Sequence, residues 1–100
     1  MPSGAIVRVR WLRAANRNLD AAANYVARED PDAAQEMYAH IRKRVVELAK
    51  RPEMGRPGRV FGTRELVIER YPYIVPYRIR GREVQIIRVF HTSQRPPEAW

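Results

Sequence analysis

GRPGRVFGTRELVIERYPYIVPYRIRGREVQIIRVFH, residues 55–91, is the stretch that decides the fold. It contains three runs in which β-branched and aromatic residues alternate with polar ones: Arg64–Arg70, Tyr73–Arg80 and Glu83–His91. Such runs are typical of strands with one buried face. The turn residues between them, Gly81 among them, predict tight connections. The stretch therefore predicts three consecutive strands in an antiparallel sheet.

Pro76 interrupts the middle run. Proline has no N–H to donate to a neighbouring strand, so within sheets it is found at edges and at bulges. The sequence therefore predicts either a β-bulge beside Pro76 or an edge position for this strand.

The chain before this stretch begins with a further strand and continues as two helices. Ile6–Leu12 alternates apolar residues with arginines, which indicates a strand with one buried face. From residue 13 to residue 29, apolar residues recur at three- and four-residue spacing among alanines, as in an amphipathic helix. Asp30 is a suitable N-cap and Pro31 fits the first helical position, so a second helix is predicted from Pro31 to about Lys50. The short connection predicts an antiparallel helical hairpin.

The predicted fold class is α+β with the order β-α-α-β-β-β. A small, mainly antiparallel sheet packs against the N-terminal helical hairpin. One hundred residues make a single domain, 1–100, whose last residues, 92–100, form a tail that is either docked or flexible. The predicted core residues are Val7, Val9, Trp11, Val75, Tyr77, Ile87 and Val89.

The composition excludes several kinds of site. The chain has no cysteine, which excludes disulfides, thiolate nucleophiles and cysteine-based zinc sites. Its two histidines, His40 and His91, are too few for a histidine-rich metal site. The glycines at positions 55 and 58 are not followed by the Lys-Ser/Thr and helix of a nucleotide-binding loop. We therefore expect no metal and no cofactor.

The charge indicates the kind of partner. The formal net charge is +8, and seventeen of the nineteen cationic residues are arginines. A surface of this sign attracts nucleic acid or an acidic protein, and arginine binds phosphate and carboxylate in a bidentate manner. No apolar run approaches the roughly 20 residues of a membrane helix, and no signal peptide is evident. We expect a cytoplasmic protein.

Alternation along the strands gathers part of this charge on one face. If the apolar residues of the first and middle strands point to the helices, Arg8, Arg10, Arg78 and Arg80 point away from them. A solvated face and a binding face are both compatible with this pattern. We expect these four arginines, together with Trp100 in the tail, to bind a partner.

A nuclease site is the alternative chemistry. His91 ends the last strand, where an imidazole could act as general acid or base in RNA cleavage. Arg88 and Arg64 would then hold the phosphate and stabilise its developing charge. A histidine that only caps the strand is the structural alternative.

The order of elements and several local strings together resemble the RelE/ParE superfamily of toxins from type II toxin–antitoxin (plasmid stabilisation) modules. The resemblance covers nearly the whole chain, and its specificity lies in the order of the strings. The matching residues are Trp11, Leu19-Asp20, Tyr25-Val26-Ala27, Asp30-Pro31, Ala33-Ala34, Met54-Gly55-Arg56, Gly62-Thr63-Arg64-Glu65-Leu66-Val67, Pro72-Tyr73-Ile74-Val75-Pro76-Tyr77-Arg78 and Ile87-Arg88-Val89-Phe90-His91.

The resemblance implies a small toxin that a cognate acidic antitoxin wraps and neutralises. It also implies one of two targets, because RelE-like members cut messenger RNA on the ribosome and ParE-like members poison DNA gyrase. In RelE-like nucleases an arginine precedes the Leu-Val-Tyr-like string of the middle strand, whereas Ile74 precedes Val75-Pro76-Tyr77 here. This departure favours a ParE-like toxin that inhibits gyrase. A ribosome-dependent endoribonuclease is the alternative, and a non-toxic, degenerate binding module is the third possibility.

Overall fold

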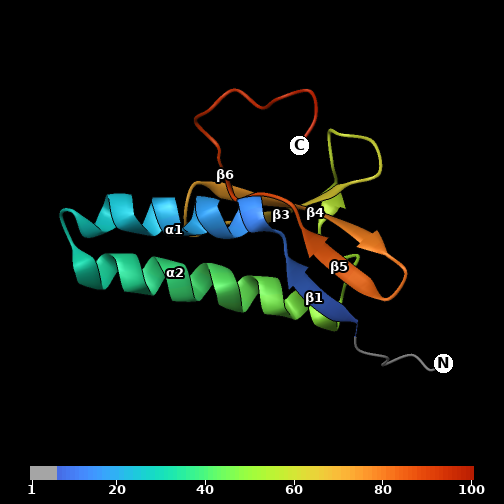
Figure 1. Cartoon of the computed structure of the whole chain (residues 1–100), viewed down its shortest axis with the longest axis horizontal. Helices are drawn as coiled ribbons and strands as arrows, with labels where there is room; N and C mark the ends of the chain where they lie inside the picture. Colours follow the sequence, from blue (N-terminus) through green and yellow to red (C-terminus); the bar gives the residue numbers. More distant parts are fainter. Residues whose placement is uncertain (1–6) are drawn as a thin grey trace.

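The computed structural model describes residues 7–100, so Ile6 of the predicted first strand lies outside it. It contains a helical hairpin that covers one face of a sheet (Figure 1). This arrangement confirms the predicted α+β class and the predicted order of the main elements. No helix in residues 7–100 is long and apolar enough to cross a membrane.

The hairpin consists of α1 (Arg13–Ala27) and α2 (Pro31–Val46), and α2 continues into the short 3-10 helix η1 (Glu47–Ala49). The side chain of Asp30 accepts a hydrogen bond from the N–H of Ala33 at 3.0 Å, which confirms the predicted N-cap. The sequence predicted a single α-helix from Pro31 to about Lys50, whereas α2 ends at Val46. The structure changes to the tighter 3-10 form at Glu47, a common way to end a helix.

The sheet contains six strands in the order β1-β5-β4-β3-β2, with β6 also paired to β4. The pair β1–β5 is parallel, and all other pairs are antiparallel. The helical hairpin returns the chain to the end of the sheet at which β1 begins, where the N–H of Val7 donates to the carbonyl of Ala49 at 3.0 Å (Figure 1). Strand β5 later runs in the same direction as β1. The strands are β1 (Arg8–Trp11), β2 (Arg56–Pro57), β3 (Arg64–Ile68), β4 (Tyr73–Arg80), β5 (Glu83–Ile86) and β6 (Phe90–His91).

A β-bulge beside Pro76 divides the predicted last strand into β5 and β6. Residues 75 and 76 of β4 lie opposite three residues, 87–89, so one extra residue is accommodated. The carbonyl of Pro76 accepts a hydrogen bond from the N–H of Ile87 at 2.9 Å, so the missing N–H of Pro76 faces this same edge. The bulge predicted as one explanation of Pro76 is therefore present, and the single continuous strand Glu83–His91 was wrong.

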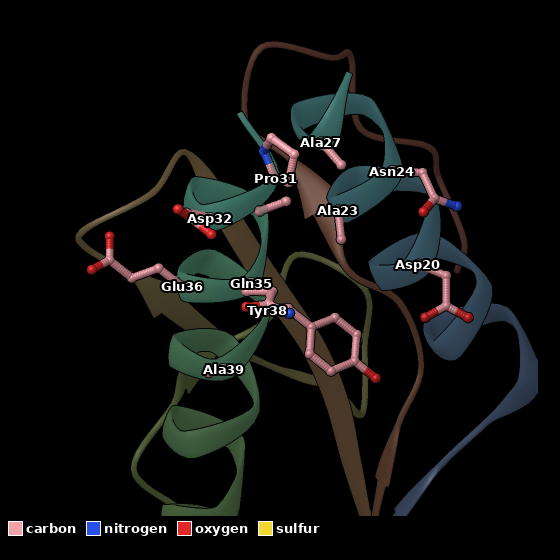
Figure 2. A pocket seen from close by; sticks show the side chains of 11 residues that line it. Asp20, Ala23, Asn24, Ala27, Pro31, Asp32, Gln35, Glu36, Tyr38 and Ala39 are labelled. Carbon is pink, nitrogen blue, oxygen red and sulfur yellow. The ribbon is translucent and has the colours of Figure 1, made fainter. Parts of the chain in front are cut away.

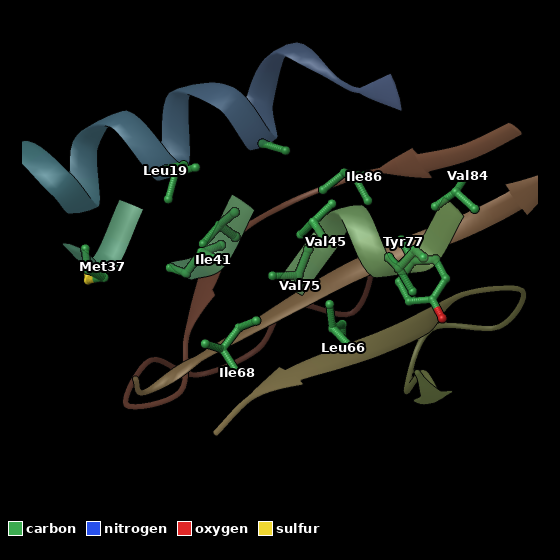
Figure 3. Close-up of a cluster of buried hydrophobic side chains, with 13 residues drawn as sticks. Leu19, Met37, Ile41, Val45, Leu66, Ile68, Val75, Tyr77, Val84 and Ile86 are labelled. Carbon is green, nitrogen blue, oxygen red and sulfur yellow. The ribbon is translucent and has the colours of Figure 1, made fainter. Parts of the chain in front are cut away.

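The hydrophobic core lies between the hairpin and the sheet (Figure 3). Val75, Tyr77 and Val89 belong to it as predicted, and the apolar residues of β1 pack against its edge. Ile87 is buried as predicted, with 7% exposed, but it lies outside the main core cluster. Ile86 and Val89 both belong to that cluster, because the extra residue of the bulge between them changes the alternation.

Candidate functional site

Four arginines, of which Arg78 is half-buried and the other three are exposed, lie together on the side of the sheet away from the helices. The strand register aligns Arg8 of β1 and Arg80 of β4 on either side of Glu83. It likewise aligns Arg10 and Arg78 on either side of Gln85 in β5. Residues in register across neighbouring strands share a face, so the structure brings these four predicted residues together. We call this surface, Arg8, Arg10, Arg78 and Arg80, the arginine face.

The arginine face carries more positive charge than its own acidic groups neutralise. Arg78 Nε donates to Gln85 Oε1 at 2.7 Å, and Gln85 Nε2 donates to Glu83 Oε1 at 2.7 Å. Arg10 Nη1 lies 3.5 Å from Glu83 Oε1, and because the Arg10 side chain is 60% exposed, this pair contributes little stability. Glu83 is the one carboxylate in register with these four arginines, and it forms an ion pair with Arg10. The remaining charge is available to carboxylates or phosphates of a partner.

Trp100 lies beside this surface rather than on it. Its ring meets the ring of Phe90 edge to face, with centroids 5.3 Å apart, and its main-chain oxygen accepts a hydrogen bond from Arg88 Nη2. Its indole Nε1 is buried and has no hydrogen-bond partner within residues 7–100.

Glu65 is the charged group that the sequence reasoning missed. It follows Arg64 in a predicted strand, and only 2% of it is exposed. Its Oε1 accepts from Arg56 Nη2 at 3.0 Å, and its Oε2 accepts from the main-chain N–H of Arg59 at 3.1 Å. Burial alone would raise the pKa of Glu65, but these hydrogen bonds and the two positive charges outweigh it and hold the pKa below its ordinary value. The carboxylate therefore ties the β2–β3 loop to the sheet.

We predict that Glu65→Gln lowers the free energy of unfolding by about 2 kcal/mol at neutral pH, because charge-assisted hydrogen bonds are lost. The pKa of Glu65 is lowered on folding, so its stabilisation is complete above the ordinary value of 4.5 and is lost as the pH falls through the lowered value. Urea unfolding of both proteins from pH 7 to pH 3 measures this. The exposed Glu69→Gln variant is the control, and a difference that stays constant over that range would contradict the prediction.

The three candidate nuclease residues do not share a site. The β4 partners of Arg64 and His91 are Tyr77 and Tyr73, four residues apart, a separation of about 13 Å along a strand. Arg64 Nη1 donates to the main-chain oxygens of Gly55 and Glu53, at 2.7 and 3.2 Å. The guanidinium of Arg64 therefore holds the loop before β2.

Arg88 and His91 are also engaged locally. Arg88 Nη1 donates to the main-chain oxygen of Ile87 at 2.8 Å, and Arg88 Nη2 donates to the main-chain oxygen of Trp100. His91 Nδ1 accepts from the main-chain N–H of Ser93 at 3.1 Å and lies 2.7 Å from the Ser93 hydroxyl oxygen. His91 faces a hollow of about 590 Å³ that Asn18 and Tyr73 also line, and neither candidate arginine lines it. Among residues 7–100, no arginine or lysine lines this hollow beside the imidazole.

Ile74 lies in β4 between Val67 of β3 and Phe90 of β6. It is 3% exposed. An aliphatic side chain enclosed in this way provides no charge for a phosphate. At the position where RelE-like nucleases have an arginine, this chain therefore has an apolar residue in apolar surroundings.

A hollow of about 1030 Å³ lies at the turn end of the hairpin, between α1 and α2 (Figure 2). Asp20, Asp32 and Glu36 lie around it among alanines. Its charge is opposite to that of the arginine face. No group of three or more potential metal ligands occurs among residues 7–100. The arginine face is therefore the better candidate for an anionic partner.

The fold and the arginine face define a small α+β protein with a cationic sheet surface. Residues 9–96 match the family described as the ParE toxin of the type II toxin-antitoxin system, parDE. The chain belongs to this ParE toxin family, within the RelE/ParE superfamily that its sequence resembles.

Individual relatives agree with this assignment. The chain is 47% identical over 91 residues to "Putative toxin Y4kP" of Sinorhizobium fredii, covering 91% of this chain and 94% of that protein. It is 32% identical over 89 residues to "Toxin RelE2" of Caulobacter vibrioides, covering 89% and 99%. A solved structure described as the chromosomal ParDE TA system from P. aeruginosa aligns with a TM-score of 0.79 at 33% identity, covering 87% of this chain and 97% of that chain.

Proposed function

We propose that this ParE-family toxin inhibits DNA gyrase through protein–protein contact and that a cognate antitoxin holds it inactive. The observation that carries the choice of target is the dispersal of Arg64, Arg88 and His91, each of which is engaged in a different local contact. The apolar burial of Ile74 adds to it. A chain without a converging set of catalytic groups acts more readily by binding than by cleaving.

The arginine face supports an acidic antitoxin as the neutralising partner. Its excess charge complements a flexible acidic segment, which binds by wrapping over a large surface. The structural relative from P. aeruginosa is described as a ParDE toxin–antitoxin system, which makes the same kind of partner reasonable here. We expect a short acidic protein to be encoded in the reading frame next to this one, and co-expression would show whether the two copurify.

The gyrase assay tests the proposal. Purified toxin is incubated with gyrase and plasmid DNA, and we expect either inhibited supercoiling or accumulated cleaved plasmid. Prior addition of the antitoxin should restore normal supercoiling. Toxin that leaves both supercoiling and cleavage unchanged would eliminate gyrase as the target. If induced expression without antitoxin also leaves cells unharmed, the chain is the non-toxic binding module.

The similarity to a relative named RelE2 makes a ribosome-dependent endoribonuclease the second candidate. In that case His91 would transfer a proton, and His91→Ala should reduce messenger RNA cleavage in a translating extract by about 100-fold or more. Under the gyrase proposal we predict that His91→Ala retains full toxicity, because the hydrogen bonds and ring contact of His91 are with Ser93 in its own turn and with Tyr73, and involve no residue of the arginine face. Growth arrest on induction and cleavage in the extract are measured in parallel.

A further inference from the structure

Phe61 is a large apolar side chain with no burial. Its relative exposure is 102%, compared with 71% for Tyr25 and 64% for Val46. A fully exposed phenylalanine buries no apolar surface on folding, so its side chain does not stabilise the core. It lies at the tip of the β2–β3 loop, residues 58–63.

The loop that presents Phe61 is held by its own hydrogen bonds. The carbonyl of Val60 accepts from the N–H of Thr63 at 3.1 Å and from its hydroxyl at 2.6 Å. The N–H of Gly58 donates to the carbonyl of Thr63 at 2.8 Å. Gly62 has a φ of +83°, so Val60–Thr63 forms a turn of type II with Phe61 at its second position. The phenyl ring therefore projects from a defined turn.

The buried carboxylate of Glu65 fixes the base of the same loop. It accepts the main-chain N–H of Arg59, two residues before Phe61, at 3.1 Å. It also accepts from the guanidinium nitrogens of Arg56 and Arg59, at 3.0 and 3.4 Å. A loop ordered in advance loses less conformational entropy when it binds. The structure thus places a buried charge beneath an exposed aromatic ring.

The surroundings of Phe61 indicate the chemistry of its partner. A hollow of about 400 Å³ lies between this loop and the sheet, and Arg78, Arg80, Ile87 and Trp100 line it together with the loop. Arg59 stands at the start of the turn, with about half of its side chain exposed. An apolar ring among arginines fits an apolar pocket with carboxylates around its rim.

We propose that Phe61 is the anchor by which the toxin binds its target protein, with the ring inserted in an apolar pocket that carboxylates border. Interface anchors are typically aromatic residues that fill a preformed pocket, and folded enzymes have such pockets. A disordered antitoxin segment offers no preformed pocket. Single-stranded nucleic acid stacks on aromatic rings along a basic groove, whereas Phe61 stands alone on a protruding turn. The choice of gyrase as this target rests on the proposed function.

Phe61→Ala tests the anchor without disturbing the fold, because the ring contacts no core residue. We expect the dissociation constant of the toxin for purified gyrase to rise at least about 20-fold. Val46→Ala, which truncates another exposed apolar residue, should change it less than about twofold. The urea unfolding midpoint should stay unchanged in both variants. Phe61→Ala that binds gyrase as tightly as the wild type overturns the proposal.

Two further measurements identify the partner class. If Phe61→Ala weakens binding to a single-stranded RNA oligonucleotide by a similar factor but leaves gyrase binding unchanged, Phe61 is a base-stacking residue and the proposal is overturned. Weakened binding to the antitoxin alone would overturn it as well. Leu in place of Phe61 should retain part of the affinity, because it still fills an apolar pocket.

Failure of the proposed function gives a different result. If the wild type does not bind gyrase but arrests growth, gyrase is excluded as the target. Growth arrest then becomes the assay for the anchoring role of Phe61. Loss of arrest in Phe61→Ala, with antitoxin binding intact, then supports the anchor, and unchanged arrest overturns it. If the wild type neither binds gyrase nor arrests growth, both proposals are overturned.

Discussion

An Arg10→Glu/Arg78→Glu double variant is expected to bind the proposed antitoxin about 1,000-fold more weakly than the wild type. Both residues lie beside Gln85 on the arginine face. Reversing them removes two attractions to an acidic segment and introduces repulsion, together about 4 kcal/mol of binding free energy. The fold should tolerate the change, because the Gln85 amide can donate to either new carboxylate. Isothermal titration calorimetry at low and physiological salt measures the affinity.

The matched control is Arg13→Glu/Arg17→Glu, which lowers the net charge by the same amount on α1, where both side chains are exposed. Glutamate at position 13, in the first turn of α1, interacts favourably with the helix dipole, and position 17 is exposed, so this control should remain folded. General attraction between oppositely charged proteins weakens in both variants, and salt screens it. Equal losses of affinity in the two variants would show that net charge, and not the arginine face, determines binding.

Much of the fold could be predicted because local signals and tertiary contacts agree. The predicted strand Tyr73–Arg80 has the same bounds in the structure. Asp30 caps α2, and Gly81, with a φ of +60°, forms the turn between β4 and β5. In each case the residue type that the local geometry requires is present in the sequence. The two-residue strand β2 was missed because so short a segment has no periodicity to detect.

The last strand shows where alternation is insufficient. Pro76 signalled a bulge, but the sequence does not say at which residue of the partner strand the extra residue is inserted. The inserted residue decides whether Ile86 or Ile87 points into the core, and only the three-dimensional pairing with β4 fixes it.

The candidate site could be predicted in part. Alternation placed the four arginines on one face, and the strand register brings them together. Their binding role stays a prediction. The burial of Glu65 had one signal, its position between Arg64 and Leu66 in an apolar strand. Its partners come from the β2–β3 loop, and such contacts have no periodic signature. Phe61 gave no signal either, because an apolar residue in a loop is as readily buried as exposed.

Gly55→Ala is expected to lower the free energy of unfolding by about 3 kcal/mol or more. Gly55 is buried where the loop before β2 meets Tyr77, whose hydroxyl accepts its N–H at 2.9 Å and donates to the carbonyl of Pro52 at 2.7 Å. A Cβ on residue 55 would lie 2.7 Å from the Tyr77 ring and hydroxyl and 2.9 Å from the carbonyl oxygen of Glu65. Tyr77 is fully buried and cannot move aside, so the added methyl group forces the loop away from the sheet.

Gly62→Ala separates this packing effect from the general cost of replacing glycine. Gly62 has a positive φ but no atom within 4 Å of an added Cβ, so only backbone strain of about 1–2 kcal/mol is expected. Displacement of the loop in Gly55→Ala also breaks the hydrogen bonds of Tyr77 and Arg64 to it, which adds to the loss. Thermal unfolding should therefore show a decrease of about 12 °C or more for Gly55→Ala, well beyond that of Gly62→Ala. Equal decreases would mean that the contact between Gly55 and Tyr77 does not hold the loop on the sheet.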